Sequence, residues 1–246
     1  FSDDIVDRDE VQLSGDGALK ARRIRRYKAV ELQSATVQAP DPAAVERALI
    51  DEIRRRGIAR LPWSKDQLRL RKRVAYAREN GAEDLPDLSD ATLTETLETW
   101  LQPYLAGCTS LGAIDAALLG NALTALLPYD ASARLDDLAP SHFTAPTGSK
   151  VPIDYGAAAG PTLSIRVQEL FGLTEHPSVC GGRLPLILEL LSPAQRPIQI
   201  TRDLPGFWAG SWADVKADMK GRYPKPPWPD DPTEAQATRR AKPRGR

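Results

Sequence analysis

The spacing of apolar and polar positions divides the chain into stretches of different periodicity. In residues 1–38, Val11 and Leu13 alternate with polar residues, and a Ser-Gly-Asp-Gly turn follows at residues 14–17. The apolar positions of one parity in the returning segment are Ile24, Val30 and Leu32. Alternation on both sides of a glycine-rich turn predicts a half-buried β-hairpin. Because a two-stranded hairpin is rarely stable alone, we expect it to be the end of a sheet whose other strands precede residue 1.

Residues 39–139 change to the helical period, with apolar positions three and four residues apart. Polar caps and a capping box mark where the helices should begin, and Gly57 and Gly81 mark two of their ends. The predicted starts are Asp41 with Pro42, Ser64 with Gln67, Ser89 or Asp90, and Ser110, followed by a short fifth helix over 131–138. We therefore expect a helical core between two regions of strands.

The apolar face of each predicted helix defines the side chains that should be buried. The expected core positions are Val45, Ala48, Leu49 and Ile53; Leu68, Val74 and Ala75; Leu93, Leu97, Trp100, Leu101 and Tyr104; and Leu111, Ile114, Leu118, Leu119, Leu123, Leu126 and Leu127. The last set is apolar on nearly every side. A helix of that kind belongs at the centre of the helical region.

Alternation of apolar and polar residues returns after Pro140. The expected strands are 142–145, 151–155, 163–167, 184–191 and 197–202. Helices followed by strands indicate an α+β fold. We predict a β-hairpin remnant of a preceding sheet, a helical core, and a small, mostly antiparallel β-sheet or open barrel with a C-terminal helix and a proline-rich strap. The corresponding segments are 1–38, 39–139, 140–232 and a basic, disordered tail over 233–246.

The end of the β-rich region concentrates aromatic residues and prolines. Trp208, Trp212 and Val215 have helical spacing after a break at residues 205–206, and Gly221 should end that helix. An extended path is then forced by Pro224, Pro226, Pro227, Pro229 and Pro232. Two tryptophans at helical spacing favour a place in the core over a role as stacking platforms. The strap, which carries Tyr223 and Trp228, is expected to pack across the domain as an anchored clasp.

Charge is balanced over the chain but not along it. The formal net charge is +0, yet residues 20–28 carry six basic residues and no acidic one, and residues 54–73 carry nine basic residues against Asp66 alone. Residues 79–98 hold seven acidic residues and no basic one. Such blocks indicate separate positive and negative surface regions. The alternative, that charged helices solvate their outer faces or pair with one another, stays open.

Candidate chemistry is sparse in this sequence. His142 and His176 lie in no spacing that builds a metal site or a catalytic triad, and Asp154, Glu169 and Asp203 have no evident partner. The two cysteines, Cys108 and Cys180, form no metal or disulfide pattern, which makes the reducing cytoplasm the default compartment. No apolar run approaches the roughly 20 residues that span a bilayer. We expect no active site here.

Five stretches of the sequence carry a resemblance to a known family. They are LPWSKDQLRLRKRV, LSDATLTETLETWLQPYLAG, LAPSHFTAPTGSKVPIDYG, RVQELFGLTEHPSV and QITRDLPGFWAGSWADVKADMKGRYPKPPWPDDP. In this order they resemble the C-terminal end of the HrpB-type bacterial ATP-dependent helicases of the DEAH-box class. The resemblance covers essentially the whole chain and is dense after Ser141.

The motor of that family is not visible in the sequence, which contains neither a GxxxxGK[ST] phosphate loop nor an Asp-Glu-Ala-His box. The chain begins with Phe1, so we expect a C-terminal piece of a longer helicase. The resemblance implies that ATP, Mg²⁺ and the unwinding of RNA or DNA belong to upstream motor domains, which would be partners of this region. The chain itself is expected to bind no cofactor and to catalyse no reaction.

The residues with the best claim to a ligand are basic, because charge is costly to bury. The expected ligand is single-stranded RNA or DNA, bound weakly and without sequence preference through its phosphates. The candidate residues are Arg54, Arg55, Arg56, Arg69, Arg73, Lys216, Lys220, Arg222, Lys225, Arg239 and Arg240. The alternative is a structural or protein-interaction module that docks on the motor or on another partner.

Overall fold

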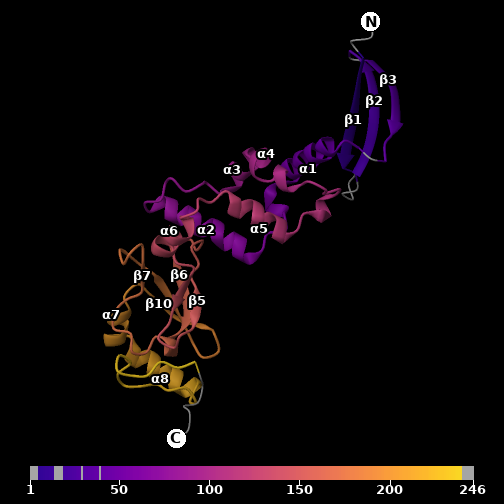
Figure 1. Cartoon of the computed structure of the whole chain (residues 1–246). Helices are drawn as coiled ribbons and strands as arrows, with labels where there is room; N and C mark the ends of the chain where they lie inside the picture. Colours follow the sequence, from indigo (N-terminus) through magenta and orange to yellow (C-terminus); the bar gives the residue numbers. More distant parts are fainter. Residues whose placement is uncertain (1–4, 14–18, 29, 39, 240–246) are drawn as a thin grey trace. The chain divides into compact units, whose positions relative to one another are not determined.

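A computed structural model describes residues 5–13, 19–28, 30–38 and 40–239, with side chains from residue 10 onward except at 13 and 19. The fold is mixed α+β, as predicted. The chain forms two compact units, residues 1–71 with 85–129 and residues 72–84 with 130–246 (Figure 1). The predicted turn at 14–17 lies outside the described residues, as do residues 240–246, with Arg240, of the tail predicted over 233–246. Residues 233–239 of that tail are described, and the Thr238 amide donates to the Gln168 carbonyl. The four-segment division by sequence stays a prediction.

The first unit begins with an antiparallel sheet in the order β1-β2-β3 (Figure 1). Its strands are β1 (Ile5–Leu13), β2 (Leu19–Tyr27) and β3 (Val30–Thr36). Ile24 is buried, but Val30 and Leu32 are 60% and 53% exposed, so their predicted burial was wrong. β3 lies at the edge of the sheet, and all of its residues are exposed on both faces. The register also shifts, because Gln33 pairs with Arg25 and Glu31 pairs with Arg26, which leaves Leu32 as an extra residue. Such a bulge reverses the parity, and Val30 faces away from Ile24.

The helices of the first unit begin largely where the caps predicted. They are α1 (Pro42–Arg56), α2 (Lys65–Glu79, shared with the second unit), α3 (Asp90–Glu95), α4 (Leu97–Trp100) and α5 (Ala116–Ala125), with short 3₁₀ turns at Ile58–Arg60, Gln102–Tyr104 and Leu111–Ala113. Asp41 accepts from the Ala43 amide at 3.3 Å. Ser64 and Gln67 form the reciprocal capping box, at 2.9 and 3.2 Å. These contacts satisfy amides that have no partner inside the helix.

Other helical predictions for this region were wrong. The helix capped by Ser110 is a 3₁₀ turn followed by α5, whose cap is Asp115, 2.8 Å from the Leu118 amide. Neighbouring residues of an α-helix point about 100° apart, and in α5 Leu119 is fully buried whereas Leu118 is half-buried. In α2, Leu68 and Ala75 are exposed. Tyr104, Ala48, Leu111, Leu126 and Leu127 are half-buried rather than core.

Leucines and a tryptophan fill the core of the first unit. The fully buried side chains include Leu49, Ile53, Leu93, Leu97, Trp100, Leu101, Leu119 and Leu123. The indole of Trp100 donates to the Leu93 carbonyl at 2.8 Å and lies 6.1 Å from the ring of Trp63. Burying a large aromatic ring with its N–H satisfied is what fixes such a core.

The second unit contains short strands followed by two helices. The elements are α6 (Ala131–Leu138), β4 (His142–Thr144), β5 (Lys150–Pro152), β6 (Thr162–Arg166), a 3₁₀ turn (Val167–Glu169), β7 (Ser178–Val179), β8 (Leu184–Pro185), β9 (Ile187–Leu191), β10 (Pro197–Thr201), α7 (Leu204–Ala209) and α8 (Trp212–Arg222). The described strands form separate small sheets and no closed barrel. In the sheet β10-β9-β6, β9 runs antiparallel to β10 but parallel to β6.

The single predicted C-terminal helix is two helices. α7 ends at Gly210, and α8 begins at Trp212 and runs through Gly221 to Arg222, so Gly221 does not end it. The break between them lets Phe207 and Trp208 of α7 and Trp212 of α8 enter one core; all three are buried.

Candidate nucleic-acid interface

Aromatic rings hold the C-terminal strap, residues 223–238, against the second unit. Trp212 is 2% exposed, and its ring centre lies 5.5 Å from that of Phe171, 5.4 Å from that of Trp208 and 5.9 Å from that of Trp228. Its Nε1 donates to the Pro229 carbonyl at 3.0 Å, and the Nε1 of Trp228 donates to the Tyr223 carbonyl at 2.8 Å. Rings covered in this way offer little face for stacking on a base.

Backbone hydrogen bonds anchor the rest of the strap. The Gly172 amide donates to the Pro232 carbonyl, and the Thr238 amide donates to the Gln168 carbonyl, each at 2.9 Å. Gly172 has φ +81°, and a Cβ there would lie 3.3 Å from the Ala235 carbonyl oxygen. The strap therefore packs as the clasp that the sequence suggested, over a position where the backbone and the close Ala235 carbonyl favour glycine.

The candidate arginines of α1 are paired with carboxylates. Arg54 lies 2.7 Å from Glu98, while Arg55 and Arg56 both lie 2.5 Å from Glu52. Hydrogen bonds from Arg55 and then Arg56 lower the pKa of Glu52 to about 2. A phosphate would have to compete with these carboxylates for the arginines, which makes α1 a weaker candidate for nucleic-acid binding.

The candidates on α2 are compensated too. Arg69 lies 3.1 Å from Asp66. Arg73 lies 2.9 Å from Asp136 and donates to the Ala139 carbonyl at 2.7 Å. Both arginines lie on α2, four residues apart, but each is bound by a carboxylate, which weakens their claim to a phosphate.

The candidates on α8 and the strap do lie near one another. Lys216 binds Asp230 at 2.6 Å, and a hydrogen bond from Lys216, with a smaller contribution from the charge of Lys220, lowers the pKa of Asp230. Arg222 lies 3.1 Å from Asp218. Lys220 and Lys225 are exposed. Arg239 is exposed as well, and its carbonyl accepts from Arg166 at 3.4 Å.

The basic block 20–28 contributed no candidate by sequence. It forms β2, where the register sets Arg23 opposite Asp9 and Arg25 opposite Asp7, and Arg26 lies 3.2 Å from Glu10. The Arg26–Glu10 ion pair supports the simpler explanation, that charges of this block pair with one another across the strands.

The histidines and carboxylates that stood out in the sequence have structural partners. His176 bridges two backbone groups. Its Nε2 lies 2.8 Å from the Leu186 carbonyl oxygen, and its Nδ1 accepts a hydrogen bond from the Leu204 amide at 3.0 Å. Glu169 accepts from Thr147 at 2.9 Å and from Ser149. Within the described residues, no group of His, Cys, Asp and Glu could hold a metal ion, and no helix is long and apolar enough to cross a membrane.

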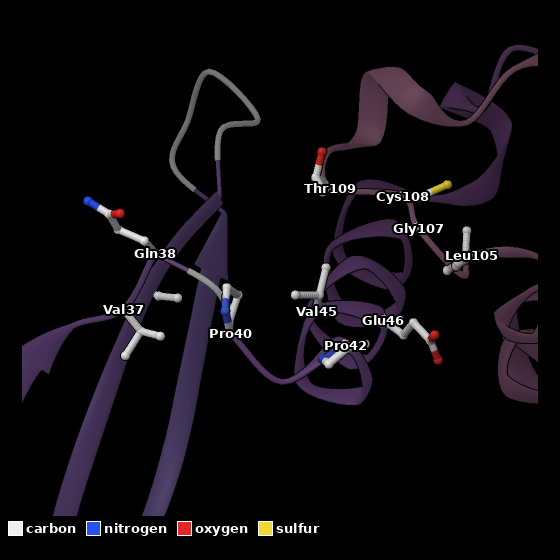
Figure 2. A pocket seen from close by; sticks show the side chains of 11 residues that line it. Val37, Gln38, Pro40, Pro42, Val45, Glu46, Leu105, Gly107, Cys108 and Thr109 are labelled. Carbon is white, nitrogen blue, oxygen red and sulfur yellow. The ribbon is translucent and has the colours of Figure 1, made fainter.

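A pocket of about 380 Å³ in the first unit is apolar (Figure 2). Its walls include Val37, Pro40, Pro42, Val45 and Leu105, with Gln38, Glu46 and Thr109 as polar groups. Burial raises the pKa of the Cys108 thiol on the wall, so the sulfur stays protonated and unreactive. A carboxylate in an apolar pocket without a basic partner in its lining is unsuited to phosphate.

Comparison with known proteins assigns the family. The family model HrpB_C, described as ATP-dependent helicase C-terminal, matches residues 100–232, more than half of the chain. The chain belongs to this HrpB_C family. The ATP-dependent RNA helicase HrpB of Escherichia coli (strain K12) is 41% identical over 240 residues, which are 97% of this chain and 29% of that protein. The resemblance found in the sequence is confirmed.

Two solved structures share the fold of this HrpB_C chain. The crystal structure of the E. coli DExH-box NTPase HrpB matches with a TM-score of 0.80 and 39% identity, over 97% of this chain and 30% of that one. The crystal structure of the E. coli DEAH/RHA helicase HrpB matches with a TM-score of 0.70 and 38% identity, over 90% of this chain and 28% of that chain. The chain thus spans less than a third of the length of these relatives.

Proposed function

We propose that this chain is an accessory C-terminal region of an ATP-dependent helicase, which helps to hold single-stranded RNA or DNA while motor domains elsewhere in the longer protein hydrolyse ATP. The match of residues 100–232 to the helicase C-terminal model carries the proposal. In it, ATP and Mg²⁺ belong to the motor domains, since the sequence has no phosphate loop. The protein works in the cytoplasm, a reducing compartment that suits the free Cys108 and Cys180.

In this proposal the phosphate contact is electrostatic and is centred on the end of α8 and the strap. Lys220 and Lys225 are exposed there, whereas Lys216 and Arg222 on α8 are paired with Asp230 and Asp218 and contribute less. The candidates Arg54, Arg55, Arg56, Arg69 and Arg73 contribute less per residue, because each is held by a carboxylate. Arg239 extends the positive region toward the C-terminal end.

The test measures binding of the chain to labelled single-stranded RNA and DNA at a series of salt concentrations. Lys220→Gln with Lys225→Gln should flatten the log–log salt slope by about 1.4, or 0.7 per phosphate contact. The matched control is Arg55→Gln with Arg56→Gln, which removes the same charge from a paired site. Equal losses in both variants would mean that only net charge matters. No binding at low salt would refute the nucleic-acid role.

A structural or protein-docking module is the second candidate function. The observation that favours it is the internal pairing of most of the candidate cations, together with a strap anchored by Trp212 and Gly172. In that case the chain binds neither single-stranded RNA nor single-stranded DNA at low salt, yet it remains folded and binds a protein partner.

A further inference from the structure

A groove of about 390 Å³ lies between α7 and the strap in the second unit. Its walls are largely carbon: Pro205, Trp208 and Ala209 from α7, and Pro232 from the strap. The indole N–H of Trp208 donates to the Leu173 carbonyl at 3.0 Å, so the polar edge of the ring is already satisfied. Trp208 is 7% exposed and lines the groove.

The rim of this groove is acidic. Asp230 and Asp231 are its charged residues among those described, and Thr174 and Thr233 add hydroxyl groups. Hydrogen bonds from Lys216 to Asp230, and from Thr233 to Asp231, lower the pKa of both carboxyls and keep them ionised. The hydroxyl and amide of Thr233 donate to Oδ1 of Asp231 at 2.6 and 2.8 Å, and a hydrogen bond from the Glu234 backbone lowers the pKa of this carboxyl further. The exposed residues Glu175, Asp203 and Glu234 adjoin the lining segments in sequence.

We propose that this groove docks a protein segment that presents an arginine or lysine side chain, with the aliphatic stem against Trp208 and the prolines and the cationic head at the carboxylates of Asp230 and Asp231. The chemistry matches in both parts, because such side chains bury an apolar stem and keep a charged end at the surface. Aromatic and carboxylate groups together attract cations. The same carboxylates repel phosphate. The groove adjoins the proposed nucleic-acid contact through the Lys216–Asp230 ion pair, but the docking of a cationic segment does not depend on that contact.

The neighbouring lysine does not cancel the acidic rim. Lys216 neutralises Asp230 at 2.6 Å, but Asp231 keeps its charge. The guanidinium of Arg202 is bound to the Ala159 carbonyl at 2.7 Å. One uncompensated carboxylate beside an apolar wall predicts a weak contact that salt screens, since it lies at the surface.

The experiment uses the whole chain labelled with 5-fluorotryptophan, and ¹⁹F NMR with the Trp208 resonance assigned by Trp208→Phe. The probe is an acetylated, amidated peptide of sequence Gly-Arg-Pro-Arg-Gly, and the comparison peptide carries neutral citrulline in place of both arginines. We expect a saturable shift of the Trp208 resonance with the arginine peptide, and about tenfold weaker binding of the citrulline peptide. Raising the salt concentration should weaken the first complex only.

Variants of the chain separate the groove from general acidity. Asp231→Asn should weaken binding of the arginine peptide about three- to fivefold. The change removes the negative charge but keeps a side-chain oxygen that accepts from the Thr233 amide. Asp137→Asn, at an exposed position of α6 outside the groove, removes the same charge and should change nothing. The proposal is overturned by equal binding of both peptides, by equal effects of the two variants, by no shift at millimolar peptide, or by a Trp208 shift with single-stranded RNA instead.

Discussion

The indole of Trp212 lies against that of Trp228, with ring centres 5.9 Å apart and planes inclined by 30°. One ring belongs to α8 and the other to the strap, and the Trp212 N–H also binds the strap at the Pro229 carbonyl. This contact joins the C-terminal strap to the core of the second unit. It makes the strap part of the fold rather than an appended peptide.

Trp212→Ala should destabilise the chain by about 3–5 kcal/mol, because the ring is buried among four others and leaves a large cavity. Trp228→Ala should cost clearly less, since Trp228 is half-buried. Urea unfolding monitored by circular dichroism gives both values. Equal midpoints for the two variants would contradict the assigned place of Trp212 in the core.

Trp208→Ala should lower stability by more than it lowers affinity for single-stranded nucleic acid. The ring is 7% exposed and contacts Phe171, Phe207 and Trp212, so its removal acts on packing. Thermal melting and a binding titration are carried out on the same preparation. A variant that melts like the parent but loses binding would make Trp208 a stacking platform after all.

Leu119→Ala should cost about 2–5 kcal/mol, whereas Leu118→Ala should cost less than half of that. The two residues are neighbours in α5, but Leu119 is fully buried and Leu118 is half-buried. The pair is its own control for helix propensity, because both changes are identical in kind. Denaturant midpoints that fall in the opposite order would show that α5 packs through another face.

Gly172→Ala should loosen the strap as well as strain the backbone. Gly148→Ala is the control, because Gly148 has a similar φ of +78° but nothing within 4 Å of its added Cβ. Both changes should cost about 1–2 kcal/mol for the left-handed backbone. Gly172→Ala should also speed hydrogen exchange of the Thr238 amide. The Cβ added at residue 172 would press on the Ala235 carbonyl of the strap and so loosen the nearby hydrogen bond from Thr238 to Gln168. Equal exchange rates in both variants would separate Gly172 from the strap.

The stability of the first unit should fall at low pH in part through Glu52. Hydrogen bonds from Arg55 and Arg56 lower the pKa of Glu52 from the usual 4.5 to about 2, so the folded state favours the ionised form. That contribution is complete above about 4.5 and is lost as the pH falls toward 2. Glu52→Gln should therefore unfold at lower urea than the parent at pH 6, with the difference vanishing near pH 2. Glu95→Gln, an exposed change in α3, should show no such convergence.

Local sequence signals determined much of the helical part. The Asp41-Pro42 start, the capping box of Ser64 and Gln67 and the stop at Gly57 depend on side chains and backbone within a few residues, so they could be predicted from spacing alone. The buried tryptophans of the C-terminal region followed from composition and periodicity. The family followed from motifs that recur in order.

Other features depend on partners that are distant in sequence. Leu32 is exposed because β3 is an edge strand with both faces exposed. β6 runs parallel to β9, a pairing between segments more than twenty residues apart. The C-terminal helix breaks at Gly210 so that both parts can bury their rings in one core. Periodicity carries no information about such register and packing.

The candidate site shows the same division. The sequence by itself determined that the chain carries basic runs, an aromatic strap and no phosphate loop, because these are matters of residue type and order. Only the tertiary structure decided which cations are compensated: Arg54 meets Glu98 and Arg73 meets Asp136 across more than forty residues of chain. It alone set Asp230 and Asp231 beside Trp208. A charge has its chemical effect through its neighbours in space, and those neighbours exist only once the chain has folded.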